Sequence, residues 1–246
     1  MEPNQTQEDL STTMTQAQTQ DQVYSIFTGG YDSHLKQWSS DPTQPKTLIR
    51  DYGEIHKTQI TRIKASPDHK YIFTTGSDKI LLQWRLGDGS LYHDWGVVLK
   101  EQWDGVMSME ITKNSKYLFL GSTYGQILQY KIRTLKVKKD YGDIFRDRRV
   151  LAMVSTSDSR YLFACGICAV IQLDVKNATV VKIYFGINQG NIFCMCLTPD
   201  DRFLFNTSED RRFKQFALCS QDSKGTVLFF KELGSEVNDL RLVVDV

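Results

Sequence analysis

Residues 60–84 read ITRIKASPDHKYIFTTGSDKILLQW. Three short runs of apolar and β-branched residues alternate here with two polar turns, at residues 66–69 (SPDH) and 76–79 (GSDK). Tyr, Ile, Phe and Thr favour strands, whereas proline presets a turn angle and Asp and Gly tolerate turn geometry. The stretch therefore predicts three strands joined by tight turns.

The chain repeats this pattern. The same order of strand-forming runs and turn residues occurs in residues 106–130, 150–173 and 192–216, and in part in residues 25–38. The second runs of the three complete copies, with the turn residues that follow, read KYLFLGSTYG, RYLFACG and RFLFNTSED. A Gln followed by a bulky residue ends each third run, at Trp38, Trp84, Tyr130, Leu173 and Phe216. By subtraction, these positions are 46, 46, 43 and 43 residues apart.

A fourth element lies between the repeats. LIRDYG (48–53) recurs as LYHDWG (91–96) and VKKDYG (137–142), with weaker copies at residues 180–186 and 227–234. Turn residues interrupt every apolar run, so no interval predicts a long helix. Four short strands in a period of about 40–46 residues are typical of a propeller. We therefore predict an all-β fold, a β-propeller of four-stranded blades.

From Val23 onward, the chain resembles a WD40-repeat protein. In that family, a turn Asp six residues before the Trp joins a His, a strand Ser or Thr and the Trp in a buried hydrogen-bond network. The resemblance implies such a structural network for His56, Thr74, Asp78 and Trp84. The same spacing is held by Asp32 before Trp38 and by Asp210 before Phe216. No unit has the complete Gly-His or Trp-Asp dipeptide of the family.

The domain organisation follows from composition. Residues 1–22 are rich in Gln and Thr and predict a disordered polar tail, either an inert leader or a linker with modifiable hydroxyls. They lack the features of a signal peptide, and no apolar run approaches about 18 residues, so we expect no membrane span or membrane partner. Residues 23–246 predict one WD40-like β-propeller.

The first repeat enters at its second strand, so its first strand is missing. Residues 236–243 match a first strand, with Val237 at the place of Ile60 and Leu240 at the place of Ile63. We therefore predict five blades, of which the first is closed by this C-terminal strand, which removes the open sheet edges. The alternative is an incomplete part of a seven-bladed propeller.

The net charge and the cysteine content limit the possible partners and the cellular compartment. The net charge is +1, with 41% hydrophobic and 24% charged residues, which is ordinary for a globular chain and gives no reason to expect nucleic-acid binding. The five cysteines are an odd number and lie mostly in apolar runs, which predicts reduced thiols packed in the core of a cytoplasmic protein. A zinc site or redox chemistry at residues 165–168 and 194–196 remains the alternative.

No motif for catalysis is present. The sequence has no G-x-S-x-G, no Gly-rich phosphate loop and no H-E-x-x-H, and its four histidines do not cluster. Among the first strands that would line a channel, Glu110 is the main acid, whereas a channel-sited hydrolase needs two carboxylates. We therefore predict no enzyme, no catalytic residue, no cofactor and no metal, and a hydrolase is the least favoured function.

One loop face is predicted to be basic. Loops before first strands and turns between second and third strands share a face, and the candidate partner-binding residues there are Lys57, Lys79, Trp103, Arg146, Arg148, Arg149, Arg211 and Arg212. Arginine suits carboxylates and phosphates, so an acidic or phosphorylated peptide is the expected protein partner. The alternatives are a solvated loop face and a Trp103 tucked under its loop. The leading function is a protein-interaction scaffold, and a structural subunit of a larger assembly is the second.

Overall fold

Antiparallel sheets follow one another along the chain. The computed structural model describes residues 25–41, 47–96, 105–134, 136–146, 148–185, 188–218 and 227–233. Within them it holds five sheets, one of three strands and four of four strands. In each four-stranded sheet the strands pair in chain order, so every sheet is a simple meander, consistent with the blade of a propeller.

The sheets are named here as blades 1 to 5 in chain order. Blade 1 contains β1 (Ser25–Gly29), β2 (His34–Ser39) and β3 (Leu48–Glu54). Blade 2 contains β4 (Ile60–Ala65), β5 (Tyr71–Gly76), β6 (Leu81–Arg85) and β7 (Leu91–Asp94). Blade 3 contains β8 (Val106–Ile111), β9 (Tyr117–Ser122), β10 (Gln126–Lys131) and β11 (Lys136–Asp143). Blade 4 contains β12 (Ala152–Ser155), β13 (Tyr161–Cys165), β14 (Ala169–Asp174) and β15 (Thr179–Phe185). Blade 5 contains β16 (Ile192–Leu197), β17 (Phe203–Ser208), β18 (Arg212–Ala217) and β19 (Val227–Glu232).

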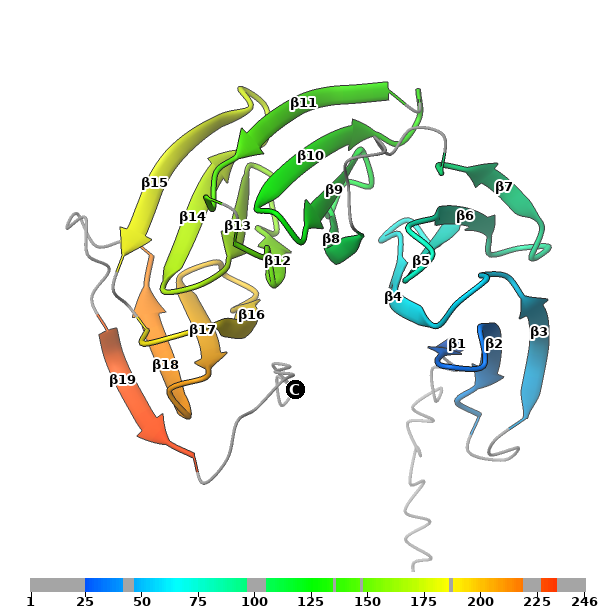
Figure 1. Cartoon of the computed structure of the whole chain (residues 1–246), viewed down its shortest axis with the longest axis horizontal. Coiled ribbons are helices and arrows are strands. Elements are labelled where there is room, and N and C mark those ends of the chain that lie inside the picture. Colours follow the sequence, from blue (N-terminus) through cyan, green and yellow to red (C-terminus); the bar gives the residue numbers. More distant parts are fainter. Residues whose placement is uncertain are drawn as a thin grey trace, which may run out of the picture.

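The blades are arranged along an arc (Figure 1). The strands β4, β8, β12 and β16 lie toward its centre, and β3, β7, β11, β15 and β19 lie on its outside. Contacts between neighbouring blades run through the innermost strands: β1 with β4, β4 with β8, β8 with β12, and β12 with β16. Each first strand therefore faces the middle of the molecule.

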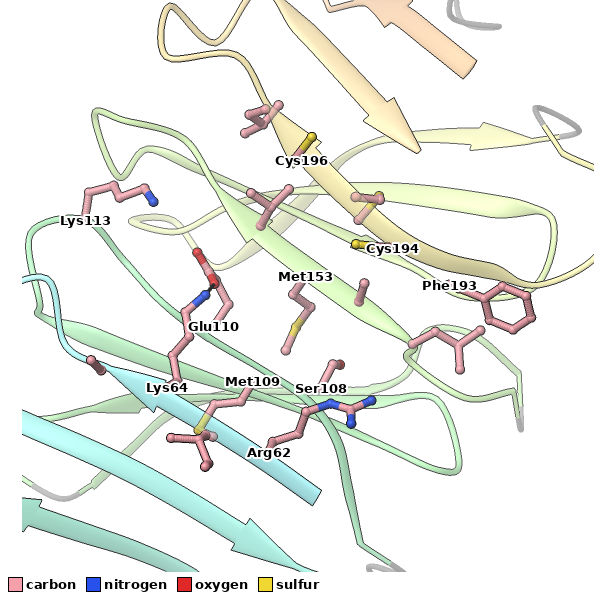
Figure 2. Close-up of a pocket in the computed structure, with 17 residues that line it drawn as sticks. Arg62, Lys64, Ser108, Met109, Glu110, Lys113, Met153, Phe193, Cys194 and Cys196 are labelled. Atoms are coloured by element: carbon pink, nitrogen blue, oxygen red, sulfur yellow. Dashed lines mark ion pairs between the residues drawn. The ribbon is translucent and has the colours of Figure 1, made fainter. Parts of the chain in front are cut away.

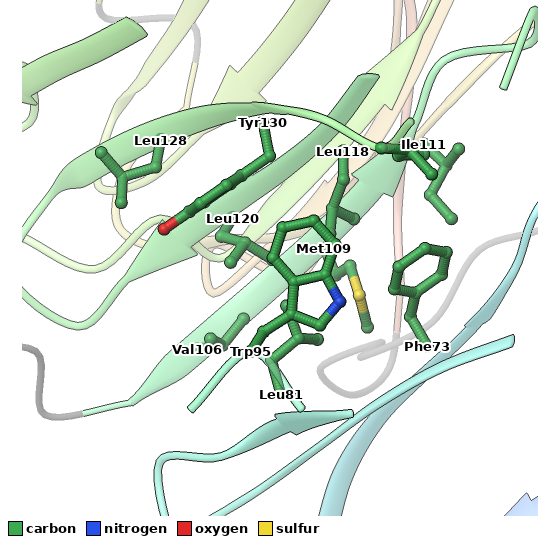
Figure 3. Packing of buried hydrophobic residues seen from close by; sticks show 11 residues of the cluster. Phe73, Leu81, Trp95, Val106, Met109, Ile111, Leu118, Leu120, Leu128 and Tyr130 are labelled. Carbon is green, nitrogen blue, oxygen red and sulfur yellow. The ribbon is translucent and has the colours of Figure 1, made fainter. Parts of the chain in front are cut away.

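The core lies between blades rather than in one central mass. Between blades 2 and 3, Trp95 is fully buried and its ring meets that of Tyr130 edge-on, with 5.3 Å between centroids (Figure 3). Phe73 and Met109 pack in the same cluster. Similar clusters join blade 3 to blade 4 and blade 4 to blade 5. Burial of such large side chains is the main favourable term in the folding of these sheets.

In blades 1 to 4, the Gln of β2, β6, β10 and β14 bonds to an aromatic residue of the fourth element. The aromatic group donates to the amide oxygen in four blades: Tyr52 to Gln37 at 3.2 Å, Trp95 to Gln83 at 3.1 Å, Tyr141 to Gln129 at 3.1 Å, and Tyr184 to Gln172 at 3.1 Å. In blades 1 to 3 the preceding Asp accepts the N–H of the following Gly, at 2.7–2.8 Å. The two repeated motifs therefore form one unit, which pairs the last two strands of a blade.

The turns between first and second strands form a second repeated unit. In each turn a Ser or Thr hydroxyl donates to an Asp or Asn two residues on and accepts the N–H five residues on: Ser66 with Asp68 and Tyr71, Thr112 with Asn114 and Tyr117, Thr156 with Asp158 and Tyr161, and Thr198 with Asp200 and Phe203. We call the surface made by these four turns the turn face. Its carboxylates, including Asp200 of the Asp200-Asp201 pair, are thus used in turns, as the sequence indicates.

The described part of blade 1 begins at its second strand. Trp38 donates to Thr28 at 2.8 Å, as Trp84 donates to Thr74 at 3.2 Å, so β1 corresponds to β5. The first strand that the sequence assigns to residues 236–243 lies outside the described residues, as do the predicted tail 1–22 and Trp103. Ring closure therefore stays a prediction.

Candidate functional site

The four residues implied by the family resemblance lie together in blade 2. His56 contacts both carboxylate oxygens of Asp78 through Nδ1 at 3.1 Å and Thr74 through Nε2 at 3.0 Å. Trp84 Nε1 donates to the same hydroxyl, and the backbone N–H of Lys57 donates to Asp78 at 2.9 Å. Burial lowers the pKa of His56, although the Asp78 carboxylate opposes this shift. The network fastens the loop before β4 to the turn between β5 and β6.

Blade 5 makes a related network from different residues. By subtraction, Asn188 precedes Asp210 by the same 22 residues that separate His56 from Asp78. Its amide donates to Ser208 at 2.7 Å and to Asn206 at 3.2 Å, and Asp210 accepts the N–H of Gln189 at 3.2 Å. Sequence reasoning found Asp210 but missed Asn188, because no His marks the position. The repeat spacing is the signal that would have found it.

Asp210 also has a cation of its own. Lys214 Nζ lies 2.8 Å from Asp210 Oδ2, and the two side chains are only 9% and 6% exposed. Burial alone would raise the pKa of Asp210, but the hydrogen bonds from Lys214 and Ser208 outweigh it and the pKa is lowered. In blade 1, Asp32 pairs with Lys36 at 3.0 Å in the same i,i+4 arrangement, but the side chains of that pair are 55% and 29% exposed.

The predicted cations lie on the loops before β4 and β12 and in or beside the turns β5–β6 and β17–β18. We call their surface the basic face: Lys57, Lys79, Arg146, Arg148, Arg149, Arg211 and Arg212. The first six are exposed, and Lys79, Arg146 and Arg211 have positive φ, so they occupy left-handed positions in their turns. Arg212 is half-buried and pairs with Glu232 at 3.0 Å. Of the acids on this face, Asp78 and Asp210 are engaged in the networks, and the exposed Glu209 accepts the backbone N–H of Asn191 at 3.0 Å.

Two tyrosines on the same loops were not anticipated. Tyr31, in the turn between β1 and β2, is 91% exposed, and Tyr124, in the turn between β9 and β10, is 44% exposed. Repeat alignment puts Tyr124 at the place of Asp78, so an aromatic group replaces the turn acid in blade 3. Exposed aromatic residues beside arginines are typical of protein-binding surfaces.

The inner strands β4, β8, β12 and β16 line a central hollow of about 770 Å³. Two tiers of side chains line it. The members of a tier come from different blades and occupy the same register position in the pairing of first and second strands. The first tier is Arg62, Ser108, Ala152 and Cys194, and the second is Lys64, Glu110, Val154 and Cys196 (Figure 2). Lys64 meets Glu110 at 2.5 Å, and the Ser155 hydroxyl donates to Glu110 at 2.8 Å. Glu110 therefore joins blades 2, 3 and 4.

The comparisons with known proteins agree with this geometry. The family model described as "WD domain, G-beta repeat" matches residues 47–85, which contain the His56 network, and four further sheets repeat the same kind of meander. These findings indicate a WD40-repeat protein. No curated protein matches the sequence. A WD40 domain typically mediates protein interactions, and the family is generally non-catalytic.

The cysteines of this WD40-repeat protein correct one prediction. Cys165 is buried in the core, as expected, and burial raises the pKa of its thiol. The expectation of core packing is wrong for Cys194 and Cys196, which are half-buried and line the central hollow, and for Cys168, whose Sγ accepts the N–H of Gly190 in a turn. One side of a first strand faces the hollow instead of another blade, so alternate residues escape the core.

The described residues supply little for metal or membrane binding. No group of three or more His, Cys, Asp or Glu side chains among them is placed to hold a metal ion. The described ranges also contain no helix with the length and apolarity needed to cross a bilayer. Glu110, the one acid of the hollow's two tiers in blades 2 to 5, is 2% exposed and already bonded to Lys64 and Ser155.

Proposed function

We propose that this WD40-repeat protein is a noncatalytic interaction scaffold and that its basic face binds an acidic or phosphorylated segment of a protein partner. The observation that carries the proposal is the set of six exposed cations on loops of blades 2, 4 and 5, on a face whose turn carboxylates are bonded internally. Arginine forms paired hydrogen bonds with carboxylates and phosphates, which suits this class of partner.

Tyr31 and Tyr124 extend the proposed surface to blades 1 and 3. A rigid aromatic side chain contributes large contact area at low entropic cost, so such residues often dominate binding energy. The cations would then steer and orient the acidic segment, and the tyrosines would anchor it.

The test is affinity capture from native lysate followed by mass spectrometry. One variant changes Arg146, Arg148, Arg149, Arg211 and Arg212 to Glu. The matched control makes the same charge change on five exposed cations of the turn face and its strand ends, Lys70, Lys113, Lys116, Arg160 and Arg202. We expect the first variant to lose a partner that the parent and the control retain, with both variants folded. Equal retention by all three chains would contradict the proposal.

A structural subunit of a larger assembly is the second candidate. It is favoured by apolar side chains that are exposed on the outer strands: Leu48, Ile49, Leu91, Tyr92, Val180, Val181 and Phe185. Phe185, on β15, is 70% exposed. Exposed apolar patches often mark interfaces. Changing Val181 and Phe185 to Lys should then abolish a partner that the charge-reversed basic face still retains.

We also propose that the blades form a closed five-bladed ring in the cytoplasm, with residues 236–243 as the first strand of blade 1. The three-stranded blade 1 and the four free cysteines of the described residues support these two points. Removal of residues 235–246 should lower the melting temperature. An unchanged melting temperature would favour the incomplete seven-bladed alternative.

A further inference from the structure

Blade 3 contains a long stretch of sequence without acidic residues. Residues 111–139 include no Asp or Glu, and they include seven cations: Lys113, Lys116, Lys131, Arg133, Lys136, Lys138 and Lys139. Because the whole chain has a net charge of +1, the rest of it carries −6 by subtraction. The near-neutral total therefore conceals a strongly basic region, and such asymmetry of charge is typical of proteins that bind anionic ligands or surfaces.

Two of these lysines are direct cross-strand partners. Lys131 at the end of β10 is paired with Lys136 at the start of β11, and both residues are exposed. Side chains at directly paired positions lie on the same face of a sheet, with about 5 Å between their Cβ atoms, and like charges there are destabilising. Neither lysine forms an ion pair with a carboxylate of the described residues. The sheet therefore holds two positive charges together without an anion between them.

The corresponding turns of the neighbouring blades contain an acid. In blade 2, Asp88 lies between β6 and β7 and accepts the backbone N–H of Ser90 at 2.9 Å. In blade 4, Asp174 at the end of β14 accepts the backbone N–H of Asn177 at 2.7 Å. In blade 3, the turn between β10 and β11 contains Arg133 and no acid. A turn at this position of a blade therefore does not require the concentration of positive charge that blade 3 has.

Further cations lie at the same end of blades 3 and 4. The carbonyl of Lys116, on the turn face, accepts the N–H of Ile132 at 3.1 Å, so the two turns of blade 3 lie against each other. Lys138 Nζ donates to the carbonyl of Lys176 at 2.8 Å, which joins this end of blade 3 to blade 4. We call the exposed cations gathered here the cation cluster: Lys116, Lys131, Arg133, Lys136, Lys139 and Lys176.

We propose that the cation cluster binds a multiply phosphorylated ligand. Because Lys131 and Lys136 lie side by side, both ammonium groups can contact one phosphate, and their mutual repulsion is then offset by attraction to the shared anion. Lysine binds phosphate as a flexible point charge, so the contact needs no fixed fork geometry. The other members of the cluster supply positive charge for further phosphates.

The surroundings favour a phosphorylated small molecule or headgroup over a nucleic acid. Proteins that bind single strands usually stack bases on exposed aromatic rings. In blade 3, Lys138 Nζ lies 4.5 Å from the ring centroid of Tyr117, and the ring also packs against a hydrophobic cluster. In blade 4, the guanidinium of Arg160 lies 4.9 Å from the ring centroid of Tyr161, which packs in the same way. These two rings are therefore not available to stack on bases.

The test is isothermal titration calorimetry of the full chain with inorganic tripolyphosphate at low salt. Lys131→Gln combined with Lys136→Gln should weaken binding at least about tenfold, because it removes two charge-assisted contacts. The matched control, Lys70→Gln combined with Arg202→Gln, removes two exposed cations of other turns and should bind like the parent. No binding by the parent, or equal affinity of the parent and the first variant, would overturn the proposal.

Thermal unfolding without ligand gives a readout that a purely structural role would not produce. Lys131→Gln removes one member of a like-charge pair, so it should raise the melting temperature by about 1–2 °C while it weakens binding. A lower melting temperature would show that Lys131 supports the fold, and the proposal would be wrong.

Cosedimentation with vesicles identifies the source of the phosphates. Phosphatidylcholine vesicles that carry phosphatidylinositol bisphosphate are compared with vesicles in which phosphatidylserine supplies the same charge. Preference for the bisphosphate would assign the cluster to a lipid headgroup, and it would replace the expectation of no membrane partner, which rested on the lack of long apolar runs. Binding of tripolyphosphate without such a preference would assign the cluster to a free phosphorylated ligand.

Two further chains of evidence separate the cluster from other binding modes. An unstructured oligoribonucleotide that binds more tightly than tripolyphosphate, and that depends on Lys131 and Lys136, would overturn the proposal in favour of a nucleic acid. The variant with the charge-reversed basic face should keep the binding that depends on these two lysines. The cluster and the basic face can therefore fail independently.

Discussion

The turn face uses one arrangement in blades 2 to 5, whereas the basic face uses different side chains in each blade. On the turn face, a hydroxyl and an Asp or Asn close each turn, and neighbouring turns are joined: Asp68 N–H donates to Ser115 at 2.9 Å, and Asn114 N–H donates to Ser159 at 3.0 Å. On the basic face, blade 2 pairs His56 with Asp78. Blade 5 instead bonds Asn188 to Asn206 and Ser208, and Asp210 to Lys214.

This difference indicates that the turn face supports the fold, whereas the basic face is the better candidate for partner recognition. A repeated arrangement that bonds each blade to the next has a structural purpose, which all blades share. The buried networks of the basic face hold its loops in place with a different set of residues in each blade, whereas the exposed cations on those loops remain accessible to a partner. Binding residues in other folds are likewise concentrated on loops that a rigid scaffold positions.

The largest effect should come from Asp210→Ala on the basic face. The change leaves Lys214 buried without its carboxylate, which typically costs about 3 kcal/mol in the free energy of unfolding. Chemical denaturation would measure the loss. The double variant Asp210→Ala, Lys214→Met removes both charges and should recover part of it. A cost below about 1 kcal/mol for the single variant would show that Lys214 rehydrates, and that this part of the basic face is not a rigid support.

Changes on the turn face should be smaller and nearly uniform. Ser66→Ala, Thr112→Val, Thr156→Val and Thr198→Val each remove a hydroxyl that makes two to three local hydrogen bonds, and each should cost about 1–2 kcal/mol. Denaturation midpoints of the four variants test the uniformity. The contrast between the two faces predicts that the four losses in unfolding free energy are similar to one another and all smaller than the loss of Asp210→Ala. A spread among the four that exceeds their mean distance from the Asp210→Ala value would contradict it.

The His56 network should make stability depend on pH. Burial lowers the pKa of His56 in the folded chain, so below pH ~6.5 the unfolded chain takes up a proton that the folded chain does not. The contribution is therefore complete above that value and is lost as the pH falls, by at most about 1.4 kcal/mol per pH unit. His56→Gln should flatten the profile between pH 6.5 and 5, as followed by chemical denaturation at each pH. Identical profiles for the parent and the variant would contradict the prediction.

Much of this architecture could be predicted because its signals are local. The Gln of each third strand and the D-[YW]-G motif recur in the sequence. The structure joins them by one hydrogen bond in blades 1 to 3, and in blade 4 it joins Gln172 to Tyr184 in the same way. The Asp78 position likewise follows from its distance to Trp84 and from the turn that holds it. Such motifs are closed by residues within one blade, so their spacing along the chain is enough to find them.

Contacts between blades could not be predicted in the same way. Trp95 lies at the centre of a core between two blades, and Glu110 bonds to Lys64 of one neighbour and Ser155 of the other. These contacts depend on the orientation of one sheet relative to the next, and no short sequence motif encodes that orientation. The same holds for Cys194, which is apolar in sequence but faces the hollow.

The smallest effect should come from Asp32→Ala. This variant removes the same kind of Asp–Lys pair as Asp210→Ala does, so a comparison of the two tests the effect of burial. Asp32 and Lys36 are spaced like Asp210 and Lys214, and the Nζ–carboxylate distances are 3.0 and 2.8 Å. The Asp32 side chain is 55% exposed, however, so Lys36 returns to water when its partner is removed. The melting temperature of Asp32→Ala should therefore equal that of the parent within error, at both low and high salt. A loss as large as that of Asp210→Ala would mean that blade 1 is covered at this site, and the segment proposed to complete blade 1 would be the first candidate for the cover.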